Sequence, residues 1–322
     1  MLSCDSYVTS KLMKNRTNLD IVLSHGLSNK LYSINYAGSK IYVLNGRGFL
    51  SYRELLDKIR VLYKQLTIDE LFDNYSPVIQ DRLVLSIPTN FIDKIDHINE
   101  NVSQIGLIYS TYIVEDIEKG NLRLCTMTSE IEELRKEISR EKLEKLRRVK
   151  MAFGEEPFYI LSIEEELGFD DSIIMDSLRN SLLDCIESNE EFYDSFVVFS
   201  GKIAYEQLGE IFKNFETYNN VVKSLLVQSI CGGSMFFHRR EFGEIISQKL
   251  GKEWEKWDKP LRKSGNIWRS IGRQCISSIR GESKLDIQNI QELLEQIKTL
   301  ELRVFRGIID QIYDTAKVST SI

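Results

Sequence analysis

The sequence predicts an α/β N-terminal domain built on a central mixed sheet, followed by a mainly helical C-terminal domain. Strand-like runs separated by turn residues follow one another closely before residue 50. Amphipathic helices then alternate with short apolar strands, and beyond Pro157 helical periodicity replaces the strand signal. We expect three parts: the α/β domain at 1–127, a connecting helix at 128–151 and the helical domain at 152–322.

The composition is that of an ordinary globular protein. With 322 residues, 42% hydrophobic and 28% charged, the chain can form two or three domains, each with its own core. The five cysteines include no CxxC pair, so we expect neither a zinc site nor a local disulfide framework, and we expect a reducing, cytoplasmic setting. No stretch approaches 18 consecutive apolar residues, so we expect no membrane span.

The first elements form a predicted meander. Strands at Leu19–Ser24, Leu31–Tyr36 and Lys40–Asn45 are separated by glycine-containing turns. Ser51 then caps a helix, Tyr52–Leu66, whose apolar residues lie on one face. The remaining elements of this domain are a buried strand at Leu83–Ile87, a helix near Phe91–Asn101, and strands at Ile105–Tyr109, Thr111–Glu115 and Asn121–Thr126.

This order of elements resembles a known family. Asp20 heads the strand LDIVL, and the helix Tyr52–Leu66 precedes the strand RLVLSIP. Over about the first 125 residues the arrangement is similar to the restriction-endonuclease-like PD-(D/E)xK nucleases, in which the first Asp binds a metal ion and the next strand carries an acid and a Lys. Here that strand reads LYSINYAGSK and has Asn35 and Ala37 at those positions. The resemblance therefore implies a degenerate, inactive nuclease-like domain.

An active nuclease is the alternative. Mg²⁺ prefers near-octahedral oxygen ligation, usually with more than one anionic ligand. No carboxylate lies between Asp20 and Glu54 in the sequence. Activity would therefore need a site relocated to Glu54 or Lys40, with Mg²⁺ as its cofactor; otherwise we expect no cofactor and no metal site.

The stretch from Ser129 to Met151 predicts one long helix. Glutamates dominate its first turns and cations its last, the order that the helix dipole favours. Further helices are expected at Ile163–Leu167, Ser172–Glu187, Ile203–Phe215 and Tyr218–Ser229, with an isolated strand at Phe196–Phe199 and an N-cap at Asp170 or Asp171.

The basic block, Phe236–Arg280, opposes the charge of the whole chain. It holds eleven Lys or Arg against five Asp or Glu, whereas the net charge of the protein is −6. All three tryptophans lie in this block, and we expect them to be packing residues. Clustered cations with aromatic residues are typical of a surface that binds polyanions, because phosphates release counterions on binding.

Two helices are expected within the basic block, Arg239–Leu250 and Pro260–Arg280. Their order resembles a helix-turn-helix or winged-helix unit, in which the second helix enters the major groove of DNA. The predicted phosphate-contacting residues are Arg239, Arg240, Lys259, Arg262, Lys263, Arg269 and Arg273. If about six of them met phosphates, the logarithm of the affinity would fall with the logarithm of the salt concentration at a slope of about −5.

The last predicted helix, Leu285–Lys317, repeats apolar residues at near-heptad spacing. Such a stripe suits either a homodimer seam or a helix packed on its own domain, and both alternatives stay open at this stage.

These features together predict a nucleic-acid-binding protein, with duplex DNA as the expected partner and no membrane partner. The nuclease resemblance implies a restriction, phage-defence or mobile-element setting, and no catalytic residue is predicted. Two alternatives stay open. One is a metal-dependent nuclease with rearranged ligands, and the other is a non-catalytic subunit whose basic block docks an acidic protein partner.

Overall fold

The chain forms two compact units in the computed structural model. Unit 1 comprises Met1–Ile21 and Ser51–Phe169, and unit 2 comprises Val22–Leu50 and Asp170–Ile322. The structure describes residues 4–13, 17–36, 38–47, 51–73, 82–92, 95–98, 109–127, 133–151, 156–194, 196–231 and 235–319. These units differ from the predicted domains, because the strands Leu27–Tyr36 and Ser39–Arg47 belong with the C-terminal helices and residues 128–151 fall within unit 1.

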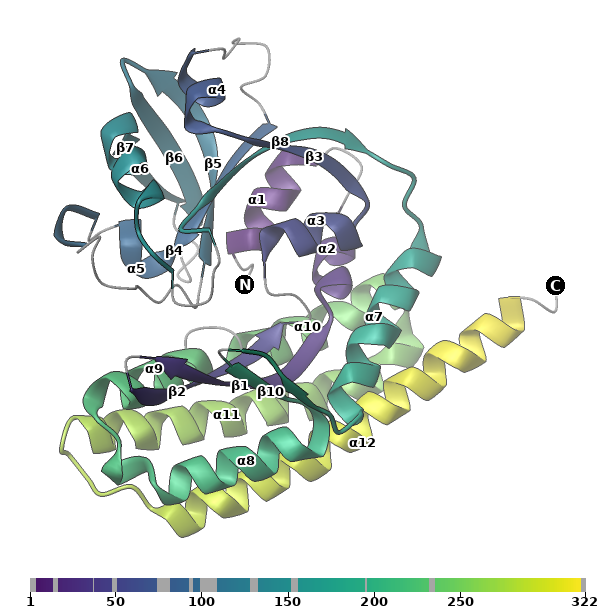
Figure 1. Ribbon diagram of the computed structural model, residues 1–322. Coiled ribbons are helices and arrows are strands. Elements are labelled where there is room, and N and C mark those ends of the chain that lie inside the picture. The colour runs from purple at the N-terminus through teal and green to yellow at the C-terminus, as the bar shows by residue number, and fades with distance from the viewer. Residues whose placement is uncertain are drawn as a thin grey trace. The chain divides into compact units, whose positions relative to one another are not determined.

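Unit 1 is built on a six-stranded sheet of order β3-β8-β4-β5-β6-β7 (Figure 1). Its strands are β3 (Val61–Leu66), β4 (Leu83–Pro88), β5 (Tyr109–Glu118), β6 (Asn121–Met127), β7 (Glu133–Ser139) and β8 (Tyr159–Glu166). Its helices are α1 (Cys4–Leu12), α3 (Tyr52–Lys58), α4 (Ile68–Asp73), α5 (Thr89–Ile92), η2 (Ile95–His97) and α6 (Arg140–Arg147), while α2 (Asn18–His25) crosses the division between the units. Neighbouring described strands all pair antiparallel. The α/β content is confirmed, whereas the predicted mixed sheet is wrong.

Helices cover both faces of the unit 1 sheet. On one face, Leu85, Tyr112 and Leu124 form a core with residues of α4, α5 and α6. On the other face α1 packs against β5 and β6, and the Tyr7 hydroxyl lies 4.0 Å from the Cys125 thiol. Strand residues alternate between the two faces, so the short apolar strands are buried on both sides, as the run Leu83–Ile87 predicted.

Two predicted helices of unit 1 differ from the observed elements, and local features of the chain explain the differences. The predicted helix Tyr52–Leu66 stops at Lys58, where Arg60 takes a positive φ of 53° and β3 begins. From residue 133 on, the predicted helix Ser129–Met151 is β7 followed by α6, with Ser139 as the N-cap of α6, and residues 129–132 lie outside the described ranges. Leu134 and Ile138 are four residues apart, a spacing that a strand with alternating faces accommodates as well as a helix.

Three further predictions change or lie partly outside the described residues. The segment Ile163–Leu167 is the end of strand β8 rather than a helix. The predicted helix Phe91–Asn101 corresponds to α5 and η2, and its last residues are outside the described ranges, as is Ile105–Tyr109 except for its final residue. The predicted N-cap at Asp170 is confirmed, since its carboxylate accepts hydrogen bonds from the Ser172 and Ile173 amides.

Unit 2 is a four-stranded antiparallel sheet packed on helices (Figure 1). Its strands are β1 (Leu27–Tyr36), β2 (Ser39–Arg47), β9 (Glu190–Phe192) and β10 (Phe196–Phe199), in the order β2-β1-β10-β9. Its helices are α7 (Asp171–Ile186), α8 (Gly201–Lys213), η3 (Phe215–Thr217), α9 (Asn220–Cys231), α10 (Phe236–Leu250), η4 (Lys252–Trp257), α11 (Asp258–Ile279) and α12 (Ile287–Ser319). The helical C-terminal region is therefore confirmed, and the strand at Phe196–Phe199 is paired rather than isolated.

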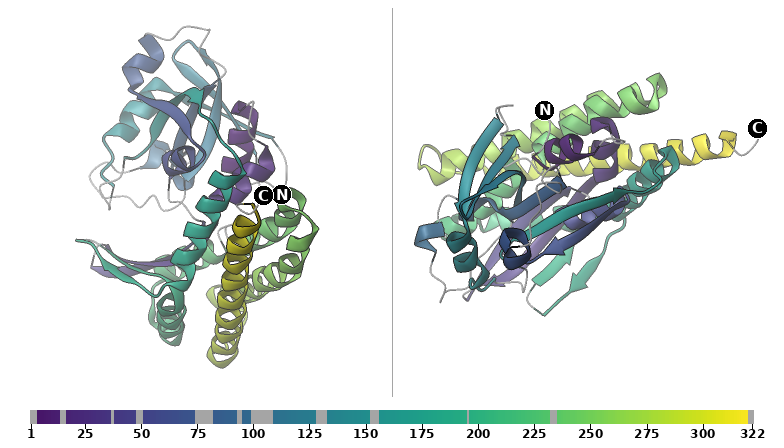
Figure 2. Two further views of the ribbon diagram at one scale, coloured as in Figure 1. Left: turned by 90° about the vertical axis from the view of Figure 1, so that its right-hand side faces the viewer. Right: turned by 90° about the horizontal axis from the view of Figure 1, so that it is seen from above.

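Two layers of helices support this sheet. Helices α8 and α9 contact the strands, and α11 and α12 lie side by side beyond them (Figures 1 and 2). The apolar stripe of α12 is buried against α7, α8 and α11, so the structure shows the second of the two alternatives for that helix. Trp254 and Trp268 are buried as packing residues, as expected.

A β-bulge interrupts the pairing of β1 with β2, at the start of β1 and the end of β2. Leu27 pairs with Arg47 and Lys30 pairs with Asn45, so Ser28 and Asn29 together stand opposite the single residue Gly46. Such a bulge interrupts the ladder and leaves backbone groups that need other partners. The buried side chain of Arg239, from α10, supplies partners for two of them.

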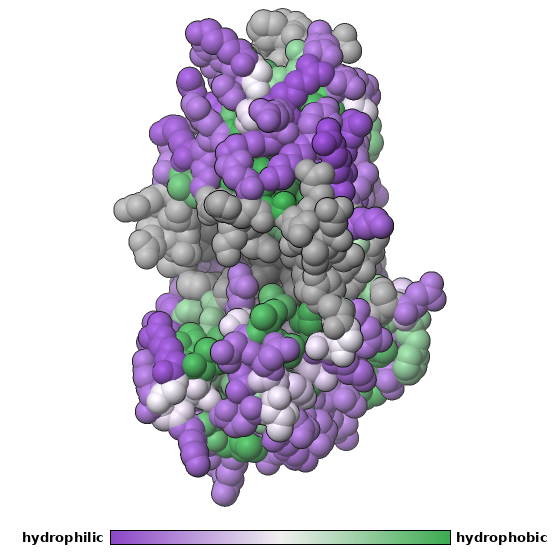
Figure 3. All heavy atoms as spheres, turned by 60° about the vertical axis from the view of Figure 1, so that its left-hand side comes forward, coloured by the Kyte–Doolittle hydropathy of each residue, from purple (hydrophilic) through white to green (hydrophobic). Residues whose placement is uncertain are grey.

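None of the helices in the described ranges combines the length and hydropathy of a membrane-spanning segment. On the face drawn in Figure 3, hydrophilic residues make up most of the described surface, and apolar residues appear in small separate groups.

Candidate nucleic-acid interface

Four of the predicted cations lie on one exposed face of α11. They are Lys259, Lys263, Arg269 and Arg273, and we refer to them as the α11 strip. At 3.6 residues per turn they fall within an arc of roughly 120° and span about 21 Å of the helix. Asp258 is the only acidic residue of this 22-residue helix. The strip therefore places four positive charges along one face of the helix.

The cations of the α11 strip are not neutralised by described acids. All four side chains are exposed, and none forms an ion pair with a carboxylate in the described part of the chain. Helix α9, which contacts α11, reads NVVKSLLVQSIC and contains no carboxylate. The charge of the strip therefore stays available to a polyanion.

Arg262 shares the exposed side of α11 but is already paired. Its Nε donates to Asp258 at 2.7 Å and its Nη1 donates to Glu244 of α10 at 2.9 Å. The hydrogen bond with Asp258 raises the pKa of this guanidinium above its ordinary value. Arg240 also lies near Glu244, but at a longer nitrogen–oxygen distance of 3.9 Å. Arg262 thus neutralises Glu244 and leaves Arg240 only loosely engaged.

Arg239 is not a surface residue, and its predicted phosphate contact is wrong. Its side chain is 0% exposed and forms an ion pair with Glu301 of α12, which is equally buried. Nε donates to Glu301 at 2.9 Å, while Nη1 and Nη2 donate to the carbonyl oxygens of Gly46 at 2.9 Å and Ser28 at 2.6 Å. Arg239 therefore satisfies the carbonyl groups that the β-bulge exposes.

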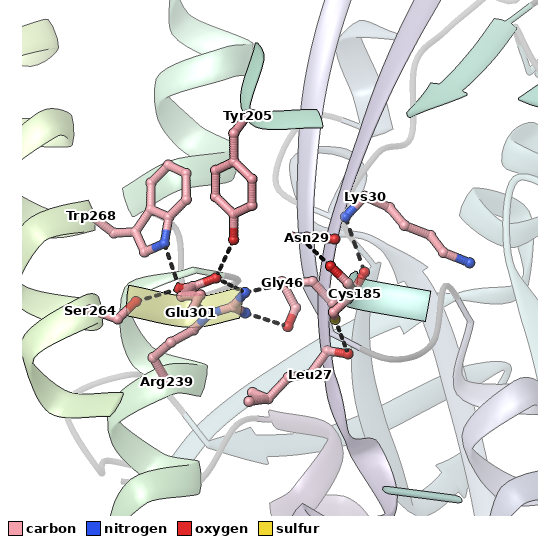
Figure 4. A network of polar contacts seen from close by, with 11 residues as sticks. Leu27, Asn29, Lys30, Gly46, Cys185, Tyr205, Arg239, Ser264, Trp268 and Glu301 are labelled. Atoms are coloured by element: carbon pink, nitrogen blue, oxygen red, sulfur yellow. Dashed lines mark hydrogen bonds and ion pairs between the residues drawn. The ribbon is translucent and has the colours of Figure 1, made fainter. Parts of the chain in front are cut away.

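Glu301 is the centre of this buried network (Figure 4). Besides Arg239, its carboxylate accepts hydrogen bonds from Trp268 Nε1 at 3.0 Å, from the Tyr205 hydroxyl at 2.5 Å and from the Ser264 hydroxyl. Burial alone would raise the pKa of Glu301, but the Arg239 charge and these donors hold it below its ordinary value. Burial raises the pKa of Tyr205, so its hydroxyl stays protonated and donates.

The bulge is held from its other side by Asn29. Its Nδ2 donates to the carbonyl oxygen of Cys185 at 2.9 Å, and its Oδ1 accepts from the amide of Gly201 at 3.2 Å. Gly201 has a φ of +61°, and a Cβ there would lie 2.4 Å from the Glu187 carbonyl oxygen. The network therefore joins β1, α7, α8, α10, α11 and α12 into one framework beneath the α11 strip.

The sequence contains a signal for this pair that the charge analysis missed. Buried residues of α12 recur at Ile290, Leu294, Ile297, Glu301, Val304, Ile308 and Ile312, so Glu301 occupies a core position in an apolar stripe. Arg239 likewise lies between buried Phe236 and Phe242 at helical spacing. A charge at a core position needs a buried partner of opposite sign. Arg239 and Glu301 are each other's partner.

Asp20 is part of a helix cap and not of a strand-borne metal site. It lies in the first turn of α2, is 7% exposed, and its Oδ2 accepts from the Thr17 amide at 2.9 Å and from the Thr17 hydroxyl at 2.7 Å. The Thr17 hydroxyl in turn accepts from the Asp20 amide, which completes a capping box. The predicted strand Leu19–Ser24 is therefore wrong. Among the described residues, no group of three or more His, Cys, Asp or Glu side chains is placed to hold a metal ion.

The other positions that the nuclease resemblance singled out are distributed over both units. Asn35 is exposed near the end of β1, and Lys40 is exposed in β2, both in unit 2. Ala37 lies outside the described residues. Glu54 lies in the first turn of α3, where its amide donates to the Ser51 hydroxyl.

Comparison with protein-family models and with curated proteins returned no match for this chain.

Proposed function

We propose that unit 2 binds nucleic acid along α11, with duplex DNA as the expected form. The observation that carries this proposal is the α11 strip, four exposed cations on one helical face without described carboxylate partners. A line of unpaired cations attracts a phosphate backbone through counterion release, even when the whole protein is acidic.

The packing of α11 favours contact with phosphates over reading of bases. Helices α9, α10 and α12 all contact α11, so it presents only one face to a ligand. A recognition helix that reads base edges must enter the major groove, which is roughly 12 Å wide. We therefore propose binding with little dependence on base sequence, and the helix-turn-helix assignment stays a prediction.

The proposal makes no catalytic use of unit 1. The nuclease alternative needs Asp20 as a metal ligand, whereas this carboxylate caps α2. Unit 1 would then contribute partner contacts, and a restriction, phage-defence or mobile-element setting remains tied to the family resemblance. The protein-interaction alternative differs in that the α11 strip would bind an acidic protein rather than DNA.

The dependence of binding on salt tests the proposal. Four phosphate contacts predict a log–log slope of affinity against salt near −3.6 for duplex DNA, shallower than the value of about −5 expected from six cations. Fluorescence anisotropy of a labelled duplex of mixed sequence, between 50 and 300 mM salt, measures this slope. A variant with Lys263→Gln and Arg273→Gln should make it shallower by about 1.8.

A matched variant separates the strip from total charge. Lys202→Gln with Lys213→Gln removes the same charge from α8, where Glu206 and Glu210 already pair with these lysines. This variant should bind almost as the parent protein does. A wild-type slope flatter than about −1, or equal losses in both variants, would show that α11 is not a phosphate-binding surface.

A further inference from the structure

One aromatic ring holds two arginines where α10 crosses α11. Phe236, the first residue of α10, is 5% exposed. The guanidinium carbon of Arg240 lies 5.4 Å from the centre of its ring, and that of Arg269 lies 5.1 Å from it. Both distances are within the range of cation–π attraction, so the ring holds cations from two different helices.

This arrangement is possible because α10 and α11 approach each other closely. Gly265 of α11 faces α10, and a Cβ at this position would lie 2.9 Å from the Phe236 carbonyl oxygen and 3.1 Å from Arg240 Cγ. Any larger side chain would push the two helices apart. Arg269 is one turn beyond Gly265 on α11, and this spacing lets it reach the ring that Arg240 contacts from α10.

The surrounding charges leave both guanidinium groups accessible to an anion. Arg269 is exposed and forms no ion pair with a described carboxylate. Arg240 is half-buried, and its distance of 3.9 Å to Glu244 is too long for a hydrogen bond. Arg262 instead donates a hydrogen bond to Glu244 at 2.9 Å. This carboxylate is therefore paired with Arg262 and forms no hydrogen bond with Arg240.

We propose that Arg240 and Arg269 form an arginine clamp that grips the phosphate backbone at this crossing. This proposal rests on the proposed function and deepens it, because it names the group that is bound and the residues that bind it. The two guanidinium carbons are no further apart than the sum of their distances to the ring centre. This upper limit allows the two groups to contact two adjacent phosphates of a strand.

Arginine, rather than positive charge alone, is needed for this role. A guanidinium presents a planar fork that donates two parallel hydrogen bonds to phosphate oxygens, whereas an ammonium is a point charge. Stacking on Phe236 also restricts each fork before the ligand arrives, which reduces the entropy lost on binding. Lys259, Lys263 and Arg273 then contribute attraction without this fixed geometry.

Replacement of Arg269 by lysine tests the clamp at constant charge. Arg269→Lys should weaken duplex DNA binding about tenfold at fixed salt, the loss of roughly one charge-assisted hydrogen bond, with an unchanged salt slope. Arg273→Lys is the matched control, because Arg273 is exposed on the same helix and contacts no aromatic ring among the described residues. It should weaken binding several-fold less than Arg269→Lys does, because lysine keeps the charge on which the contribution of Arg273 rests. Equal effects of the two substitutions would overturn the clamp.

A second measurement does not depend on DNA. Nuclear magnetic resonance of arginine Nε–H groups, during titration with inorganic pyrophosphate, should shift the Arg240 and Arg269 signals together at concentrations that leave Arg273 unmoved. Uniform shifts of all three signals would mean diffuse charge and would refute the clamp. Selective shifts without DNA binding would keep the clamp as a site for small phosphates and reject the proposed function.

Discussion

Glu301→Gln is the sharpest test of the buried framework beneath the α11 strip. The substitution keeps the shape of the side chain and one carbonyl acceptor but removes the negative charge. Arg239, which is 0% exposed, would then be a buried cation with only neutral acceptors, among them the carbonyl oxygens of Ser28 and Gly46. Breaking one side of a buried ion pair typically costs about 3–5 kcal/mol.

The expected loss is large against the stability of an ordinary domain. We expect the free energy of unfolding of unit 2 to fall by about 3–5 kcal/mol, measured by urea denaturation, and its melting temperature to fall by roughly 6–20 °C. A control with both Arg239→Met and Glu301→Leu should lose less than the sum of the two single changes, because it leaves no unpaired charge.

The pH dependence of stability follows from the direction of the pKa shift. The pKa of Glu301 is lowered in the folded protein, so its contribution is fully present above the unfolded value of about 4.3 and is lost as the pH falls through the lower folded value. The stability difference between the wild type and Glu301→Gln should therefore stay constant from pH 7 to about pH 5 and narrow only below about pH 4. A loss under about 1 kcal/mol at pH 7 would refute the assigned role of the pair.

Two other substitutions test local features of the fold. Asp20→Ala should destabilise α2 and its unit by about 1 kcal/mol through loss of the capping box with Thr17; magnesium-dependent DNA cleavage that disappears in this variant would instead support the nuclease alternative. Gly26→Ala should cost about 2–4 kcal/mol, because Gly26 has a φ of +63° and a Cβ would lie 2.0 Å from the Ser181 hydroxyl oxygen. Gly281→Ala, at a φ of +72° in open space, should cost only about 1 kcal/mol, and equal losses in urea denaturation would contradict the steric argument.

Elements with strong local signals were predicted correctly. Strand β2 follows a turn that contains Gly38, α7 begins at the Asp170 cap, and α11 shows one apolar face with the cations opposite. In each case the residues that specify the element lie within a few positions of one another. Errors arose where two periods agree over a short stretch, as in β7, where the spacing of Leu134 and Ile138 fits a helix and a strand alike.

The pairing of distant segments was not predictable from local patterns. Strand β1 pairs with β10, which lies more than 150 residues later, and this pairing assigns the N-terminal hairpin to the unit with the C-terminal helices. Adjacent strand-like runs predict a shared sheet by default, since most sequential strands are neighbours. The global arrangement of apolar faces, rather than the hairpin itself, decided which core the hairpin joined.

The sequence by itself determined that positive charge is concentrated between Phe236 and Arg280 and that α11 has one apolar and one basic face. Only the tertiary structure decided which of these cations can meet a ligand. Arg239 and Arg269 are both arginines of the same basic block, yet one is buried on Glu301 and the other is exposed beside Phe236. The physical reason is that the cost of burying a charge depends on its partner, and for Arg239 that partner comes from a helix 62 residues away in the chain.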